Sequence, residues 1–284
     1  MNQTKRYPAA LTVAGSDSGG CAGIQADLKT FSALGVFGAS VLTAVTAQNT
    51  TEVRDVEVLS PETVRRQAEA VFDDLAIDAV KTGMLPTPAI IETVAAMIDR
   101  YRPATVIADP VMVATGGARL TAASVAGAFR ETLYPRVTLL TPNMPEAEAL
   151  SGVPVRTEDD FHRAADVLLA QGCRAVLIKG GHLASEVAAD WLFRQDRAPV
   201  AFTSPHIPTA NLHGTGCTLS SAIAACCALG MELEAAVGAA KTYVTSAIRQ
   251  GSDVRTGKGN GPVNHFFEPK RLTANVGAKC FRPY

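Results

Sequence analysis

The sequence predicts an α/β fold in which helices cover a mainly parallel central sheet. Short apolar, β-branched runs alternate with helical patterns along most of the chain, which is typical of βα units. The length of 284 residues and the apolar content of 47% allow a substantial buried core. No repeat or linker interrupts the pattern, so we predict a single domain over residues 1–284, with a mobile polar tail after about residue 269.

Six short apolar runs are candidate strands of this sheet, because polar or turn-forming residues follow each of them. They cover residues 10–14, 40–46, 79–81, 105–108, 137–140 and 175–178. Residues 192–202 contain two further runs around the polar stretch 194–197. This segment predicts an antiparallel hairpin at the edge of the sheet.

The helices are predicted from apolar residues spaced three to four apart. Two such faces are formed by Ile24, Leu28, Phe31 and Leu34, and by Val64, Ala68, Val71 and Leu75. Thr157 is a suitable N-cap for a helix through Gln171, with Asp160 three residues on. Residues 214–229 and 233–249 predict two closing helices.

Composition excludes several classes of protein. The formal net charge is −1, whereas a general nucleic-acid binder needs a basic field. The apolar stretches are shorter than a membrane span, and the N-terminus lacks the apolar core of a signal peptide, so we expect a cytoplasmic protein. The six cysteines form no CxxC pair or zinc-finger spacing, which favours reduced, mostly buried thiols.

Polar residues follow all six predicted strands, and in open parallel sheets ligands bind beyond the carboxyl ends of the strands. Six polar strand ends therefore indicate a binding site. These segments are residues 15–20, 48–49, 81–84, 109–110, 141–143 and 179–182.

The segment His213-Gly214-Thr215-Gly216-Cys217-Thr218 opens a helical pattern. Two glycines let the backbone approach a ligand, and the free N–H groups at a helix start attract phosphate. The segment is neither a Walker A loop nor a GxGxxG motif. The alternative, a glycine-rich helix start with only a structural role, stays open on this motif alone.

Asn143 and Glu146 follow the fifth predicted strand and can hold Mg²⁺ through water, with Asp109 at the end of the fourth strand as a further carboxylate. The alternative for Asn143 and Glu146 is a capping box at a helix start, which these residues alone favour. Asp109 is otherwise a turn or cap residue.

Lys179 precedes two glycines and can neutralise a phosphate, and the amide of Gln48 matches the edge of a heteroaromatic ring. The alternatives are a solvated strand end and a turn residue. Met84 and Val111 are residue types found more often in a core than in a ligand wall. The histidines His182, His206 and His213 share no spacing and are interpreted as non-catalytic.

Taken together, eight segments resemble the hydroxymethylpyrimidine/phosphomethylpyrimidine kinases of thiamin biosynthesis, which belong to the ribokinase-like superfamily. They are AGSDSGGCAGIQADLKTF, TAQNT, KTGML, DPVM, TPNMPEAE, IKGGH, HGTGCTLSSAIAA and GPVNHF, in the family's order over about residues 10–267. The resemblance implies a ribokinase-like three-layer α/β/α fold and a homodimer. It also implies ATP-dependent phosphorylation of 4-amino-5-hydroxymethyl-2-methylpyrimidine, and then of its monophosphate.

The resemblance also implies roles for individual residues. Gln48 binds the pyrimidine edge, while Gly15, Asp27, Met84 and Val111 surround the ring and its hydroxymethyl group. The nucleotide end comprises Asp109 and Glu146 for Mg²⁺, with Asn143, Lys179 and Lys241 for ATP. Gly214, Thr215, Gly216 and Cys217 form the anion hole, in which Cys217 replaces the superfamily's catalytic Asp. Cys217 is either a proton acceptor or only part of that hole.

The sequence departs from the family at three places. Cys21 replaces a common Gly, Leu212 replaces a frequent Thr, and residues 114–117 lack a frequent Lys, a departure that bears on the second phosphorylation. Two rival functions stay open: a pyridoxal kinase of the same superfamily, and a non-catalytic pyrimidine sensor. The helix start is also expected to lower the pKa of Cys217 below about 8.5.

Overall fold

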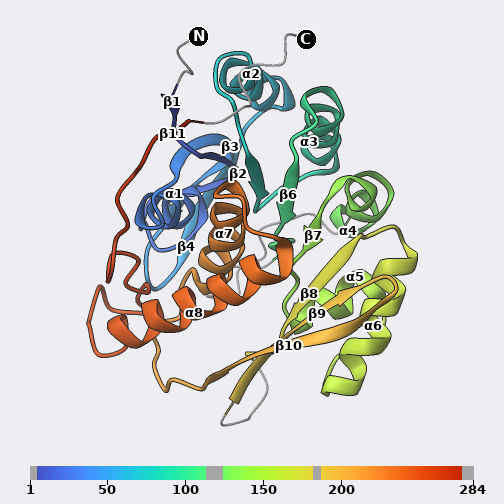
Figure 1. Ribbon diagram of the computed structural model, residues 1–284, viewed down its shortest axis with the longest axis vertical. Coiled ribbons are helices and arrows are strands. Elements are labelled where there is room, and N and C mark those ends of the chain that lie inside the picture. Colours follow the sequence, from blue (N-terminus) through green and yellow to red (C-terminus); the bar gives the residue numbers. More distant parts are fainter. Residues whose placement is uncertain (1–4, 113–123, 182–186, 277–284) are drawn as a thin grey trace.

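The computed structural model describes residues 5–112, 124–181 and 187–276, and its core is a mainly parallel sheet (Figure 1). In this part of the chain the sheet has nine strands in the order β10-β9-β8-β7-β6-β5-β2-β3-β4. The six central strands, β8 to β3, run parallel, while β4 at one edge and the β9–β10 hairpin at the other are antiparallel. The bounds are β2 (Ala9–Asp17), β3 (Phe37–Gln48), β4 (Val53–Val58), β5 (Ala79–Thr82), β6 (Thr105–Ala108), β7 (Leu139–Leu140), β8 (Ala175–Lys179), β9 (Val187–Arg194) and β10 (Arg197–Pro205).

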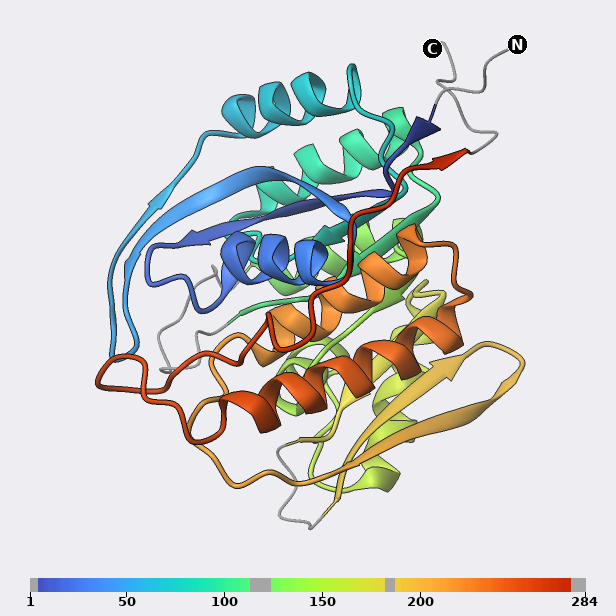
Figure 2. The same ribbon diagram turned by 60° about the vertical axis from the view of Figure 1, so that its left-hand side comes forward.

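Helices cover both faces of the sheet, which gives the three-layer α/β/α fold (Figure 2). One face packs against α1 (Gly23–Ala33), α7 (Thr215–Ala228) and α8 (Leu233–Gly251). The other packs against α2 (Pro61–Phe72), α3 (Pro88–Tyr101), α4 (Val125–Ala128), α5 (Met144–Ser151) and α6 (Glu158–Ala170). A π-helical turn (Phe129–Leu133) and a 3₁₀ turn (Tyr134–Arg136) follow α4, and β1 (Lys5–Arg6) pairs with β11 (Asn275–Val276) in a separate ribbon.

Local sequence explains where the helices begin. The hydroxyls of Ser60 and Thr87 accept the backbone N–H three residues on, and a proline follows each of them at the first helical position. Thr157 and Asp160 form a capping box, which confirms the predicted start of α6. Both predicted closing helices are confirmed as α7 and α8.

The predicted strands and the edge hairpin are confirmed, with two differences. The strand predicted over residues 137–140 is limited to Leu139–Leu140, because Val137 ends the preceding 3₁₀ turn. Strand β4 was not predicted, since its sequence VRDVEV carries three charges and lies mostly exposed at the sheet edge. Charged residues are common on such edges, where they discourage pairing with other chains. Among the described residues, no helix is long and apolar enough to cross a membrane.

Candidate active site

A cavity of about 920 Å³ lies at the carboxyl ends of the parallel strands, where the polar strand ends predicted a site. Its size is at the upper end of the range for small-molecule pockets, enough for more than one small ligand. Of the residues predicted for the site, all except Asp27 line this cavity. They are Gly15, Gln48, Met84, Asp109, Val111, Asn143, Glu146, Lys179, Gly214, Thr215, Gly216, Cys217 and Lys241.

The glycine-rich turn before α7 packs directly against the loop that follows β2. Gly214 has φ +82°, and a Cβ at this position would collide with the carbonyl oxygen of Cys21. The carboxylate of Asp17 holds that loop, because it accepts the backbone N–H groups of Gly19, Cys21 and Ala22 at 2.8–2.9 Å. Only glycine therefore satisfies both the backbone conformation and the close approach at residue 214.

Helix α7 begins at the cavity without a side-chain cap. The N–H groups of the first helical turn have no acceptor within an α-helix, so those of Gly216 and Cys217 are suited to bind an anion. Gly216 lies beside two charged groups: a Cβ placed on it would be 3.4 Å from Lys179 Nζ and 3.8 Å from Asp109 Oδ2. The predicted anion hole, cation and carboxylate are thus brought together.

Lys179 and Asp109 form an ion pair in which Nζ lies 2.8 Å from Oδ1. The Asp109 carboxylate also accepts the hydroxyls of Thr141 and Ser220, each at 3.3 Å. Burial alone would raise the pKa of Asp109, but the cations of Lys179 and Lys81 hold it below its usual value. Asp109 is therefore a carboxylate, and Lys179 a cation, at neutral pH.

Asn143 and Glu146 form the capping box of α5 that was the alternative reading of these residues. The Asn143 side chain accepts the Glu146 N–H at 2.9 Å, and Glu146 Oε2 accepts the Asn143 N–H at 2.8 Å. Glu146 Oε2 also lies 3.8 Å from Lys179 Nζ, and both residues line the cavity. Burial raises the pKa of Glu146 to about 7, so its charge changes near neutral pH.

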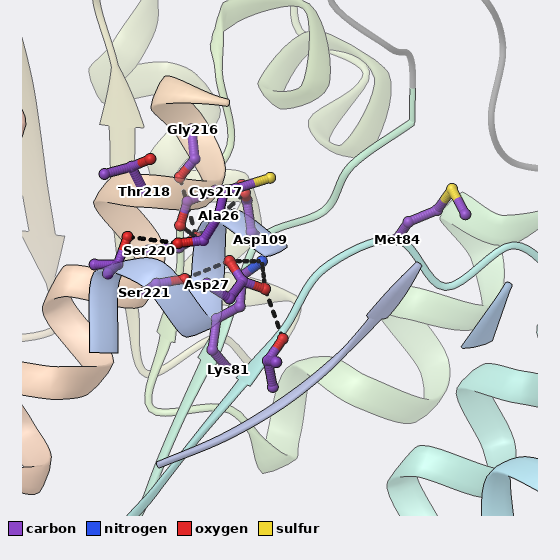
Figure 3. A network of polar contacts seen from close by, with 12 residues as sticks. Ala26, Asp27, Lys81, Met84, Asp109, Gly216, Cys217, Thr218, Ser220 and Ser221 are labelled. Atoms are coloured by element: carbon purple, nitrogen blue, oxygen red, sulfur yellow. Dashed lines mark hydrogen bonds and ion pairs between the residues drawn. The ribbon is translucent and has the colours of Figure 1, made fainter. Parts of the chain in front are cut away.

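Asp27 differs from its predicted position, because it lies beneath the cavity and not in its wall. Both of its carboxylate oxygens bind Lys81 Nζ, at 2.9 and 3.0 Å, and both side chains are fully buried (Figure 3). Thr12 and Ser221 donate their hydroxyls to the same carboxylate. Its hydrogen-bonding capacity is thus met within the protein, and Lys81, not Asp27, lines the cavity.

Lys81 belongs to one of the predicted polar strand ends, but the sequence assigns it no individual role. Burial would lower its pKa, but the Asp27 carboxylate outweighs burial and raises that pKa above its usual value. Lys81 is therefore a permanent buried cation. A lysine inside the apolar strand AVKT signals a buried partner, since an unpaired buried charge is costly. The partner lies 54 residues earlier in the chain, where only the fold reveals it.

The expected low pKa of Cys217 is wrong. Burial raises its pKa to about 11, although the Lys81 cation and the Gly23 N–H act in the opposite direction. The effect of the helix start is therefore smaller than the cost of placing a thiolate in a buried site. Cys217 is a neutral thiol at pH 7, and the five described cysteines, which include Cys226 and Cys227 in α7, are all free.

The opposite end of the cavity, called here the neutral end, is lined mainly by uncharged groups, and the Asp17 carboxylate beside it is bound by backbone N–H groups. Gln48 ends β3, and its amide contacts the Thr46 hydroxyl and the ring of His213. Met84 reaches across to Gly15, where a Cβ would lie 2.5 Å from the Met84 methyl group. His213 was interpreted as non-catalytic, and its contact with Gln48 spans 165 residues, so no local sequence pattern predicts it.

Lys241 on α8 lies where β9 passes the cavity. Its Nζ is 2.8 Å from Asp190 Oδ2, and the other oxygen of Asp190 accepts the Gly180 N–H at 3.1 Å. His206 lines the cavity as well. Residues 114–117, His182 and Cys280 lie outside the described residues.

The chain is similar to several known proteins over most of its length. The family profile described as phosphomethylpyrimidine kinase matches residues 17–264. A protein of Escherichia coli named hydroxymethylpyrimidine/phosphomethylpyrimidine kinase is 48% identical over 258 residues, which cover 90% of this chain and 97% of that protein. A thiamine biosynthesis bifunctional protein of Geobacter sulfurreducens is 49% identical over 267 residues, 93% of this chain and 54% of that protein. The crystal structure of an ADP complex of Bacillus subtilis pyridoxal kinase is similar with a TM-score of 0.84 and 40% identity, covering 92% of this chain and 98% of that one.

Proposed function

The chain belongs to the phosphomethylpyrimidine kinase family, and from this premise we propose its substrates and the roles of its site residues. It is a kinase that transfers the γ-phosphoryl group of ATP. Its acceptors are 4-amino-5-hydroxymethyl-2-methylpyrimidine and then the monophosphate of that compound, which gives the diphosphate used in thiamin biosynthesis. The fold and the family agree on ATP-dependent phosphoryl transfer.

The observation that carries the proposal is the arrangement of the cavity. A neutral amide, Gln48, stands at one end, and an uncapped helix start with Lys179 and Asp109 stands at the other. A neutral heteroaromatic ring fits the first end and a polyphosphate fits the second. Both ends open into one cavity, so an acceptor and ATP can meet inside it.

At the neutral end, Gln48 binds the edge of the pyrimidine ring. Gly15, Met84 and Val111 surround the ring, and the side chain of Met84 limits the space above Gly15. Asp27 acts from beneath the cavity, where it holds Lys81 in place and charged on the side of the charged end. We therefore assign Asp27 a positioning role and no direct contact with the ring.

At the charged end, the hydroxymethyl oxygen attacks the γ-phosphorus, a new P–O bond forms, and the bond to the β-phosphate oxygen breaks to release ADP. The backbone N–H groups of Gly216 and Cys217 and the Lys179 cation stabilise charge on the transferring oxygens. Gly214 and Thr215 shape the turn, in which the Thr215 N–H donates to the Leu212 carbonyl at 3.2 Å. Asn143 and Lys241 bind the nucleotide. The hydroxyl proton leaves to the thiolate form of Cys217, which is the minor form at neutral pH because its pKa is about 11. In the second step an oxygen of the monophosphate is the nucleophile.

The residues at this end fit a Mg²⁺ ion. Mg²⁺ is usually held by one or two carboxylates, with substrate phosphates and water as its other ligands. Asp109 and Glu146 are two such carboxylates on either side of Lys179, and the described residues hold no cluster of three or more metal-binding side chains. When bound, Mg²⁺ neutralises charge on the phosphates of ATP.

Pyridoxal kinase activity is the second candidate, because the Bacillus subtilis pyridoxal kinase shares the fold at 40% identity. The test is ATP turnover, measured with a coupled assay, on hydroxymethylpyrimidine, its monophosphate and pyridoxal, followed by mass analysis of the products. We expect both pyrimidines to be phosphorylated in preference to pyridoxal. Faster turnover of pyridoxal would favour the second candidate, and no turnover with any of them would indicate a non-catalytic sensor.

We further propose that the protein is a cytoplasmic homodimer, on the strength of its family resemblance. Light scattering after size-exclusion chromatography tests the oligomeric state, and a mass near twice 29.7 kDa is expected. A mass near 29.7 kDa would contradict the dimer.

A further inference from the structure

His213 sits at the junction between the anion hole and the neutral end of the cavity. It immediately precedes Gly214, its side chain is buried, and its backbone N–H donates to the Gly261 carbonyl at 3.1 Å. Its ring atom Nε2 lies 3.1 Å from Nε2 of Gln48. The backbone of His213 is therefore fixed by its hydrogen bond to Gly261, and its ring faces the Gln48 amide.

The surroundings of His213 determine which ring nitrogen carries the proton. Burial lowers its pKa below the usual 6.5, although the charge of Asp17 and a hydrogen bond with the Asn260 backbone act in the opposite direction. The ring is therefore neutral at pH 7. A backbone contact that raises the pKa of the ring is one with an accepting carbonyl, so we assign the ring N–H to the Asn260 contact, an assignment that fits the Gln48 amide nitrogen 3.1 Å from Nε2. Nε2 is left as an acceptor facing Gln48.

An acceptor at His213 determines the orientation of the Gln48 amide. The Gln48 NH₂ group must face Nε2, since two acceptors placed 3.1 Å apart would repel each other. Gln48 Oε1 then lies 3.2 Å from the Thr46 hydroxyl, whose hydrogen is shared with the Ser16 carbonyl at 3.0 Å. One amide N–H and one lone pair of Oε1 remain for a ligand.

We propose that His213 is a positioning residue that sets the order of donor and acceptor on Gln48, and thereby selects a 4-aminopyrimidine edge over a 4-oxopyrimidine edge. The inference rests on the proposed function, in which Gln48 binds the ring edge. A 4-aminopyrimidine presents a donor, the exocyclic amine, beside an acceptor, the ring nitrogen N3. Oε1 of Gln48 accepts from the amine while its N–H donates to N3, as amides do with adenine.

The 4-oxo analogue, which carries an oxygen in place of the amine and a hydrogen on N3, presents the reverse order. It would bind an amide turned by 180°, and turning the amide would place Oε1 against the Nε2 acceptor of His213. A correctly paired amide contributes about 1–3 kcal/mol of discrimination, which corresponds to a factor of roughly 5–150. Removing the His213 ring frees the amide to turn and reduces this factor.

The experiment compares the wild-type protein with His213→Leu on the 4-amino substrate and its 4-oxo analogue. The ratio of the two kcat/KM values is the readout, together with the KM for ATP. We expect the wild-type ratio, roughly 5–150, to fall to near one in His213→Leu, chiefly through the KM of the pyrimidine, while the KM for ATP changes less than threefold. Thr46→Val removes the hydroxyl that contacts Oε1 of Gln48 and should also lower the ratio. This variant replaces His213→Leu in the test if His213→Leu does not fold.

His162→Leu is the matched control, because His162 is an exposed histidine on α6 that packs against Trp191 and Phe193 and does not line the cavity. It should keep the wild-type ratio. An unchanged ratio in folded His213→Leu, or an equal loss for both substrates, overturns the proposal. Absence of wild-type turnover with the 4-amino substrate would instead refute the proposed function, so the two failures are distinguishable.

Discussion

The charged end of the cavity and its neutral end are built by different physical means. Three ion pairs, Lys81–Asp27, Lys179–Asp109 and Lys241–Asp190, line or support the charged end. The neutral end contains hydrogen bonds among uncharged groups, with Gln48 at their centre. Phosphate recognition needs cations that stay charged in a buried place, and the paired carboxylates ensure this. Ring recognition needs a fixed order of donor and acceptor, which neutral contacts provide without a desolvated charge.

This comparison predicts its largest effect at the most buried ion pair. Lys81→Met leaves the carboxylate of Asp27 buried without its cation, and breaking such a pair costs about 3–5 kcal/mol. Chemical denaturation should show this loss of unfolding free energy. The double variant Lys81→Met/Asp27→Asn should recover part of it. Arg54→Met, which removes an exposed pair with Glu52, is the control and should leave the midpoint unchanged. A fully stable Lys81→Met would mean that the pair does not support the charged end.

The second prediction concerns the Cys217 thiol, the proposed proton acceptor at the charged end. We expect Cys217→Ala to lower kcat by about 10² or more, with a modest change in ATP affinity, because general-base help is worth roughly 10²–10⁴ in rate. The pKa of about 11 adds a signature: the thiolate fraction, and with it the wild-type kcat, should rise as pH rises from 7 to 9. The alanine variant should lose this slope. A variant within a few-fold of wild type would leave the backbone amides as the main catalytic device.

Alkylation tests the same thiol without a mutation. Iodoacetamide should modify Cys217 and inactivate the enzyme, and bound pyrimidine with ATP should protect it, since Cys217 lines the cavity. Cys226 and Cys227 lie in the last turn of α7, outside the lining of the cavity, and should react slowly. Mass spectrometry of the modified peptides gives the rate at each site. Inactivation that follows modification of Cys227 instead would remove Cys217 from this role.

At the neutral end, Gln48→Ala should weaken pyrimidine binding far more than ATP binding. An unpaired buried ring edge costs about 1–3 kcal/mol, which is a factor of roughly 5–150 in the dissociation constant. Separate calorimetric titrations with the pyrimidine and with an ATP analogue measure the two effects. An equal loss of affinity for both ligands would place Gln48 outside the ring-binding end. It would also contradict the assignment of ring binding to the neutral end.

The smallest effect is expected from Glu146→Gln, which should raise the Mg²⁺ concentration needed for half-maximal activity a few-fold. The pKa of about 7 means that the wild-type carboxyl becomes protonated as pH falls from 8 to 6, so its Mg²⁺ requirement should rise over that range. The glutamine variant should show no such pH dependence. If Glu146 only caps α5, the variant will lose a little thermal stability and keep the wild-type Mg²⁺ response.

The fold was predicted well because its signals are local. Alternating strands and helices gave the parallel sheet, and Thr157 with Asp160 gave the start of α6. The edge strand β4 was missed, since an exposed charged strand lacks the apolar pattern that marks the others. Polar residues at the strand ends also predicted the cavity, because parallel strands end at the same edge of the sheet.

The site's long-range contacts were not predictable from the sequence. Asp27 was assigned to the ring from family resemblance, and its pairing with Lys81 depends on how α1 packs on the sheet. The pKa of Cys217 was assigned from the helix start alone, and the opposing effect of burial requires the packed structure. The contact between Gln48 and His213 joins two segments that meet only in the folded chain. Each of these properties arises from tertiary packing.

Helix α7 has a consequence for synthesis of the chain on the ribosome. It supplies the anion hole and also, with α8, covers one face of the sheet, where Ile223 packs with Ala10 and Ile107. The strands β2, β5 and β6 of this face are made more than 100 residues before α7, which corresponds to roughly 5–20 s at typical rates of translation. During that interval an apolar sheet face has no cover, a condition under which nascent chains aggregate or bind chaperones. Arrival of α7 therefore closes the core and completes the phosphate site in the same event.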